Sequence, residues 1–98
     1  MTRSLRFSSA ARRDFTNIAA RSERAWGKAK TREYLDEIEA KFRAIVDNPM
    51  LGHDAGLPRE GLRRISAGRD VIFYTFDDHE VAVVRILHDR MDFEALIQ

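Results

Sequence analysis

The sequence predicts an α+β domain in which an antiparallel helical hairpin packs on a mainly antiparallel β-sheet. Two observations support this class. Between residues 9 and 48, apolar side chains recur three and four positions apart, which is the period of a helix. After residue 61 they recur every second position, which is the period of a strand. Helices and strands segregated in this way are typical of α+β folds, and 98 residues suit a single domain, 1–98.

A short strand and an amphipathic helix open the chain. Leu5 and Phe7 alternate with polar neighbours, which predicts the strand. Ser8 or Ser9 is suited to cap the helix that follows, because a serine hydroxyl accepts a hydrogen bond from an amide of the first turn. One face of this helix carries Ala11, Phe15, Ile18, Ala19 and Ser22.

A glycine separates the first helix from a second one. Trp26-Gly27 interrupts the helical pattern, and glycine costs about 1 kcal/mol inside a helix relative to alanine, so we expect a bend there. Asn48-Pro49 ends the second helix, because the residue before a proline avoids the helical region. The two helices are expected to form a hairpin with one apolar seam. The second helix contributes to that seam Tyr34, Leu35, Ile38, Phe42, Ile45 and Val46.

Three strands and a short helix complete the chain. They follow a loop over residues 49–61, which prolines and glycines punctuate. The strands, rich in β-branched and aromatic residues, are expected at Leu62–Ser66, Val71–Phe76 and Val81–Leu87. Asp92 is a suitable cap for a terminal helix, which is expected to pack back on the domain through Ala95, Leu96 and Ile97.

The last two strands are apolar on both faces, whereas a sheet with one wet face normally alternates. The faces of the first of them are expected to hold Val71, Phe73 and Thr75 on one side and Ile72, Tyr74 and Phe76 on the other. Those of the second are expected to hold Ala82, Val84 and Ile86 on one side and Val81, Val83, Arg85 and Leu87 on the other. One hairpin covers one face only. The other face therefore needs as its cover either a partner protein or the terminal segment Met91–Ile97.

Composition excludes several classes of function. The chain has no cysteine, so disulfides and thiolate metal sites are excluded and a reducing cytoplasm is the expected location. No apolar run approaches the roughly 20 residues of a membrane span, so we expect no membrane association. His53 and His79 have no ligand partner at metal spacing, so we expect no metal and no cofactor. A net charge of only +1 argues against direct nucleic-acid binding.

The strands carry an ordered set of motifs, which are GLRR at Gly61–Arg64, SAGRDVIFY at Ser66–Tyr74 and VRILHDRMD at Val84–Asp92. Trp26-Gly27 and NPMLG at Asn48–Gly52 precede them. Together these motifs resemble the ParE branch of the ParE/RelE toxin superfamily over nearly the whole chain. The fold of that superfamily has the same element order as the one predicted from periodicity.

The resemblance implies a toxin of a type II toxin–antitoxin module, of the plasmid-stabilisation type. ParE toxins inhibit DNA gyrase or a related enzyme such as topoisomerase IV by binding, and a ParD-like antitoxin neutralises them by wrapping the toxin with its carboxy-terminal segment. Antitoxin contacts are expected at Trp26, Arg63, Phe73, Val83, Arg85 and Leu87. Target contacts are expected at Arg90, Met91 and Phe93.

An alternative is the activity of the RelE branch, which cleaves messenger RNA on the ribosome. That chemistry needs general acid–base groups and positive charge on the phosphate. Its candidates here are Arg63 and Arg85, expected to converge on one sheet face, together with Arg64, His88 and Arg90. The chain departs from that branch because it has no tyrosine after Tyr74 and no lysine in residues 49–61. A third alternative is a neutral member that only binds its antitoxin.

Arg85 is unusual because it interrupts an apolar strand, and a buried charge needs a partner. The sequence leaves open whether that partner is a carboxylate of this chain, a carboxylate of the antitoxin, or a substrate. His88 has two alternatives as well, a catalytic role or a hydrogen bond to backbone at the strand end.

Overall fold

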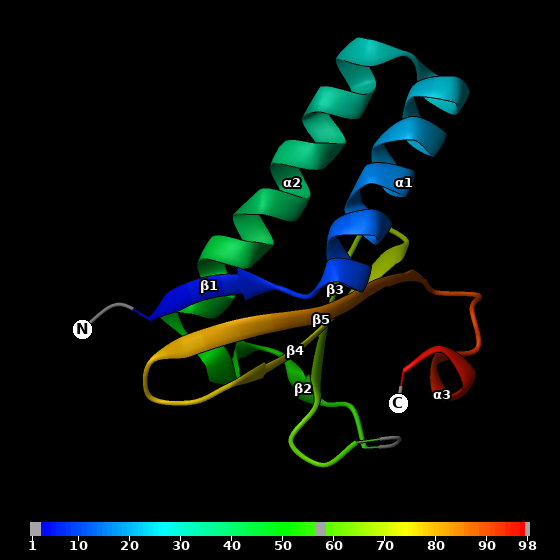
Figure 1. Cartoon of the computed structure of the whole chain (residues 1–98). Helices are drawn as coiled ribbons and strands as arrows, with labels where there is room; N and C mark the ends of the chain where they lie inside the picture. The colour runs from blue at the N-terminus through cyan, green and yellow to red at the C-terminus, as the bar shows by residue number, and fades with distance from the viewer. Residues whose placement is uncertain (1–2, 57–58, 98) are drawn as a thin grey trace.

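Two antiparallel helices lie on one face of a β-sheet, and a short third helix follows the last strand (Figure 1). The computed structural model describes residues 3–56 and 59–97. The helical elements are α1 (Ser9–Trp26), α2 (Lys28–Asp47), the 3₁₀ turn η1 (Pro49–Leu51) and α3 (Phe93–Leu96). The strands are β1 (Ser4–Phe7), β2 (His53–Asp54), β3 (Arg63–Ala67), β4 (Asp70–Phe76) and β5 (Glu80–His88). The predicted α+β class is confirmed.

The helical hairpin begins and bends at the predicted residues. Ser8 Oγ accepts a hydrogen bond from the Ala11 amide at 2.9 Å, which satisfies one free donor of the first turn of α1. Gly27 lies between α1 and α2 with a φ of +84°, a backbone conformation that favours glycine. α2 ends one residue before Asn48, whose side chain accepts a hydrogen bond from the Met50 amide.

The sheet is mixed, with strand order β1-β5-β4-β3-β2. β1 pairs with β5 in parallel, with Ser4 opposite Glu80 and Phe7 opposite Val83, and the other described pairings are antiparallel. The loop predicted over residues 49–61 also contains η1 and β2, which were not predicted. A single 3₁₀ turn and a two-residue strand are too short to produce a recognisable period.

A β-bulge in β5 changes which of its side chains face the helices. Phe73 lies opposite Arg85 and Tyr74 opposite Val83, so Val84 is one extra residue in the ladder. On the helix side the strand contributes Val81, Val83 and Ile86. On the opposite side it contributes Val84 and Leu87. The predicted faces of β5 are therefore wrong, because they assumed unbroken alternation, whereas the predicted faces of β4 hold.

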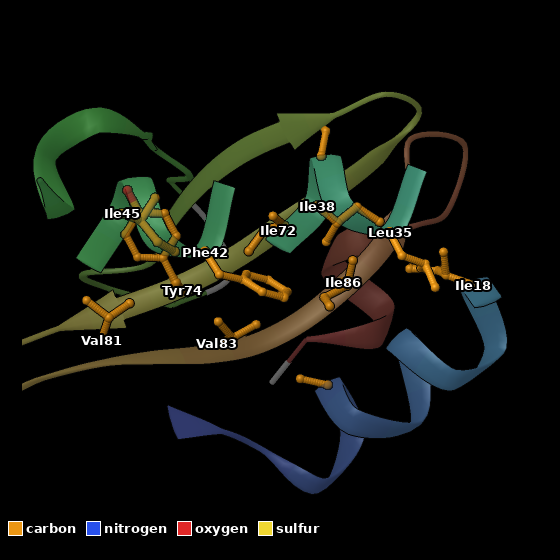
Figure 2. Close-up of a cluster of buried hydrophobic side chains, with 12 residues drawn as sticks. Ile18, Leu35, Ile38, Phe42, Ile45, Ile72, Tyr74, Val81, Val83 and Ile86 are labelled. Carbon is orange, nitrogen blue, oxygen red and sulfur yellow. The ribbon is translucent and has the colours of Figure 1, made fainter. Parts of the chain in front are cut away.

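The main core lies between the hairpin and the sheet (Figure 2). Its buried residues are Ala11, Ile18, Leu35, Ile38, Phe42, Ile45, Ala67, Ile72, Tyr74, Val81, Val83 and Ile86. The sequence places nearly all of these on the inward helix faces or in the strands. Burial of each large aliphatic or aromatic side chain contributes roughly 1.5–3 kcal/mol, so this layer is the principal source of stability.

The opposite face of the sheet carries a second, smaller core. Its buried members, each at most 1% exposed, are Leu62, Val71, Phe73, Leu87 and Ile97. Phe93 of α3 packs edge-on against Phe73, with ring centroids 4.8 Å apart. The sequence left two covers open for this face, a partner protein and the terminal segment. The chain's own terminal segment, Met91–Ile97, covers it, which was the alternative.

Candidate interaction surfaces

The outer edge of β5 beyond β1 is closed by side chains of α1 and its cap. Ser8 Oγ donates a hydrogen bond to the Val84 carbonyl at 2.6 Å, and Asp14 Oδ2 accepts one from the Ile86 amide at 2.9 Å. These contacts stand in for the backbone groups of a further strand. This stretch of edge is consequently protected against pairing with another chain.

Asp14 also binds Arg85 through both carboxylate oxygens, at 2.8 and 2.9 Å. The guanidinium donates a third hydrogen bond to the Leu96 carbonyl at 3.0 Å, which ties the terminal segment to the sheet. The hydrogen bonds to Asp14 raise the pKa of Arg85, against the opposing effect of partial burial. Of the partners left open by the sequence, a carboxylate of this chain is the one observed.

Arg63 braces the turn η1 from the helix side of the sheet. It lies opposite Tyr74, and its guanidinium donates hydrogen bonds to the carbonyls of Met50, at 3.2 Å, and Gly52. The Tyr74 hydroxyl donates to the Pro49 carbonyl at 2.7 Å and accepts from the Gly52 amide at 2.9 Å. Arg63 and Tyr74 therefore fix the position of η1 relative to β3 and β4.

Of the residues considered for nuclease chemistry, Arg63 and Arg85 are not brought together, whereas Arg64 and Arg85 lie on the same face of the sheet, on either side of Phe73. Arg63 lies on the helix side of the sheet and Arg85 on the opposite side, which corrects the expectation that they converge. His88 Nδ1 accepts a hydrogen bond from the Arg90 amide and lies 3.2 Å from an Asp89 carboxylate oxygen. The His88 contact with backbone at the strand end is therefore observed.

The residues expected to contact the target lie together after β5. Arg90 and Met91 are exposed, while Phe93 is half-buried against the second core. Arg64, on this side of the sheet, places its guanidinium 5.3 Å from the Phe93 ring centroid and 5.9 Å from that of Phe73. This end of the sheet thus presents an exposed cation and a thioether beside an aromatic cluster.

The residues expected to contact the antitoxin differ widely in exposure. Phe73, Val83 and Leu87 are at most 1% exposed, so no partner reaches these side chains in this structure. Trp26, by contrast, is 55% exposed at the end of α1, where its ring packs edge-on against Tyr34. Sequence reasoning could not separate these cases, because apolar strands give the same pattern whether a partner or the chain itself covers them.

An open apolar groove of about 450 Å³ lies where β1, α1 and α2 meet, and we call it the hairpin groove. Phe42 is central to it, with its ring centroid 5.0 Å from that of Phe7 and 6.1 Å from that of Phe15. Its other lining residues are Arg12, Thr16 and Glu39. The sequence assigned Phe15 and Phe42 to the core seam and missed that the rings also line a surface groove.

A buried carboxylate joins the hairpin to the β3–β4 turn. Asp70 is 1% exposed, and its two oxygens accept hydrogen bonds from Nη2 of Arg21 at 3.1 and 3.2 Å. The Tyr34 hydroxyl donates to Asp70 Oδ2 at 2.5 Å and lies 2.8 Å from the Ala67 carbonyl. Burial, and next the hydrogen bond to Asp70, raise the pKa of Tyr34.

Replacing Tyr34 with phenylalanine should lower the free energy of unfolding by about 1–2 kcal/mol at pH 7, because buried Asp70 loses a donor. Since the pKa of Tyr34 is higher in the folded chain than in the unfolded one, wild-type stability should fall as the pH rises above about 10. The Tyr34→Phe variant has no hydroxyl to ionise, so its stability lacks this pH dependence. Urea unfolding between pH 7 and 11 should therefore show that the difference in the free energy of unfolding between the two proteins becomes smaller at high pH. A constant difference would contradict this account.

The described residues offer neither a membrane-spanning helix nor a metal centre. Their helices are too short or too polar to cross a bilayer. They also contain no group of three or more histidine, aspartate or glutamate side chains placed to hold a metal ion.

Comparison with known proteins decides the family. The model of the family described as "ParE toxin of type II toxin-antitoxin system, parDE" matches residues 5–93. The chain belongs to this family. It is a ParE-family toxin of a type II toxin–antitoxin system, as the motifs indicated. Toxin ParE1 of Caulobacter vibrioides is 32% identical to it over 90 residues, which cover 92% of this chain and 93% of that protein.

Solved structures share the fold of this ParE-family toxin. The chromosomal ParDE system from P. aeruginosa matches with a TM-score of 0.75 and 16% identity, over 89% of this chain and 96% of that chain. The toxin–antitoxin complex RelBE2 from Mycobacterium tuberculosis matches with a TM-score of 0.60 and 24% identity, over 90% of this chain and 99% of that chain. At these identities the likeness concerns the fold.

Proposed function

We propose that this ParE-family toxin acts by binding DNA gyrase or topoisomerase IV, without catalysis of its own, and that a ParD-like antitoxin neutralises it. The observation that favours binding over nuclease chemistry is the placement of Arg63 and Arg85. They lie on opposite faces of the sheet, and oxygens of the chain itself accept their hydrogen bonds. RNA cleavage requires cations directed at one phosphate. The choice of target rests on the resemblance to the ParE branch.

The hairpin groove is the surface that we assign to the antitoxin. Its aromatic base suits the apolar face of an amphipathic helix, a common way of docking a helix in a groove. Arg12 on its rim, and Arg13 beside it, form no ion pair within the described part of the chain, so they favour an acidic partner segment. The solved ParDE and RelBE2 structures are toxin–antitoxin assemblies of the same fold, which supports a partner of this kind.

Reversing the charge on the groove rim should weaken antitoxin binding. We expect the Arg12→Glu variant to bind a ParD-like antitoxin about tenfold more weakly, equivalent to about 1.4 kcal/mol, because an acidic segment then meets a like charge. Arg24→Glu, an exposed position of α1 outside the groove, is the matched control and should change affinity little. Titration calorimetry at two salt concentrations measures both variants. If the two variants lost antitoxin affinity equally, the hairpin groove would not be the docking site.

The surface that we assign to the topoisomerase is the end of the sheet with Arg90, Met91 and Phe93. Arginine, methionine and aromatic side chains are enriched in protein interfaces. This surface carries all three kinds, and the exposed Met91 lies directly before the α3 cap. A toxin that binds there leaves the hairpin groove free.

Purified toxin tests the proposal directly. Incubation with DNA gyrase, and separately with topoisomerase IV, should block supercoiling or decatenation and accumulate cleaved DNA, and added antitoxin should reverse both effects. Normal activity of both enzymes would exclude this target class. Sequencing of transcript ends after toxin induction distinguishes the alternative, since new cuts within translated codons would indicate a ribonuclease.

A further inference from the structure

The two helices place opposite charges along the hairpin groove. α1 contributes Arg12, and α2 contributes Glu39 beside the ring of Phe42. Within residues 3–56 and 59–97, neither of the two charged groups forms an ion pair. In this part of the chain the aromatic base of the groove therefore has an unpaired cation on its α1 side and an unpaired anion on its α2 side.

Glu39 has two candidate cations in its own chain and pairs with neither. Arg43 follows it by four positions on α2, which is the favoured order and spacing for an ion pair on a helix. Arg12 lines the same groove from α1. The ion pairs of the described residues include neither combination, and Asp36, one turn earlier on α2, is matched by Arg32. The Glu39 carboxylate therefore lines the groove without a cation from the described residues.

On the α1 side the positive charge extends beyond the groove. A shallow hollow of about 250 Å³ lies on this helix, and its lining residues are Arg12, Arg13, Thr16 and Asn17. Arg12 and Thr16 line both this hollow and the hairpin groove, so the two adjoin along one ridge of α1. The carboxylate of Asp14, the acidic residue of this part of α1, is already bound by Arg85. A partner's carboxylate on this side consequently meets two arginines, and a partner's lysine is repelled.

A helix that covers the aromatic base would remove both charges from water. Glu39 is already only partly exposed, and burial of an ionised group without a partner is strongly unfavourable. A uniformly acidic segment satisfies Arg12 but repels Glu39, and a uniformly basic segment does the reverse. A helix with acidic residues on one flank of its apolar stripe and a basic residue on the other satisfies both. Discrimination between partners of similar apolar surface commonly arises from such repulsive contacts.

We propose that Glu39 is a specificity-determining residue of the hairpin groove, which selects an antitoxin helix with a lysine or arginine on the flank that faces α2 and acidic residues on the flank that faces α1. The same pattern sets the direction in which the helix docks, because turning the helix end for end exchanges its two flanks. The assignment of the occupant as the antitoxin rests on the proposed function. The charge pattern that the groove prefers does not depend on it.

Three synthetic helical peptides of about 20 residues test the charge pattern. They share one apolar stripe and carry glutamates on one flank and lysines on the other, glutamates on both flanks, or lysines on both flanks. Fluorescence anisotropy should show that the full-length toxin binds the mixed peptide at least threefold more tightly than either of the others. Glu39→Lys should make the all-glutamate peptide the tightest, whereas Glu33→Lys, at an exposed position of α2 that does not line the groove, should keep the wild-type order. Preference of the wild type for a uniformly charged peptide, equal effects of the two lysine variants, or no binding of any peptide would overturn the proposal.

Titration calorimetry with a ParD-like antitoxin separates this inference from the proposed function. Glu39→Lys should weaken antitoxin binding about tenfold, whereas Glu33→Lys should change it little, and thermal unfolding should show that both variants remain folded. If Arg12→Glu weakens binding and Glu39→Lys does not, the groove receives the antitoxin and the proposal for Glu39 fails. If neither charge reversal weakens binding, the assignment of the groove to the antitoxin fails, while the three peptides still decide which charge pattern the groove prefers.

Discussion

Deletion of residues 92–98 should lower the free energy of unfolding by about 3–5 kcal/mol. The deletion removes Phe93 and Ile97 from the second core, and burial of each contributes roughly 1.5–3 kcal/mol. Phe73 and Leu87, now at most 1% exposed, become accessible to water. Arg85 also loses its contact with the Leu96 carbonyl. Urea unfolding followed by circular dichroism measures the loss, and binding of a hydrophobic dye should report the opened face.

Two point variants make the same test without shortening the chain. Ile97→Ala removes a side chain that is 1% exposed and should account for about 2 kcal/mol or more of the loss. Leu96→Ala, its sequence neighbour, is 42% exposed and should change stability by less than about 0.5 kcal/mol. Equal effects at the two positions would show that the terminal segment does not cover the second core in solution.

Asp14→Ala should lower the free energy of unfolding by about 3 kcal/mol, because it removes one partner of a largely buried ion pair. The side chains of Asp14 and Arg85 are 11% and 21% exposed. Without the carboxylate, Arg85 retains its charge but only the hydrogen bond to the Leu96 carbonyl, and the Ile86 amide loses its acceptor. Chemical denaturation at pH 7 measures the change.

The double variant Asp14→Ala/Arg85→Met separates the ion pair from simple packing. Removing both charges should recover part of the loss, because no unpaired guanidinium then remains near the second core. The exposed pair of Arg6 and Glu80 provides the comparison, and Glu80→Ala should have a much smaller effect than Asp14→Ala. If the double variant lost as much stability as the two single variants together, the account of Asp14 and Arg85 as an internal ion pair would be contradicted.

Most of the fold follows from local patterns. The 3.6-residue period located α1 and α2, because each helix buries only one stripe of side chains. Gly27 marked the bend, since its positive φ is readily adopted only by glycine. The bulge at Val84 left no trace in the sequence. β5 is apolar on both faces, so a shift by one residue exchanges apolar residues for apolar residues and the hydrophobic pattern stays unchanged.

The interaction surfaces were harder to predict, because they depend on contacts between distant segments. The sequence indicated that Arg85 needs a carboxylate, yet nothing local selects Asp14, which is 71 positions away. The sequence left the cover of the second face equally undetermined, because an apolar strand has the same residue pattern whether α3 or a partner protein covers it. Met91–Ile97 had the right composition to be that cover, and only the packing of Phe93 and Ile97 shows that it is.

The parallel pairing of β1 with β5 has a consequence for how the toxin comes into being. Phe7 lies opposite Val83, and Ser8 Oγ donates a hydrogen bond to the Val84 carbonyl, so the first strand finds its neighbour only after the chain has been made as far as Val84. Until β5 has been made, β1 and β4 lack the strand that lies between them, and both cores lack the side chains that β5 contributes. Contacts between such distant segments also slow folding. We therefore expect toxic activity to appear only after β5 has been made and has paired with both β1 and β4, which delays that activity relative to the synthesis of the helical hairpin.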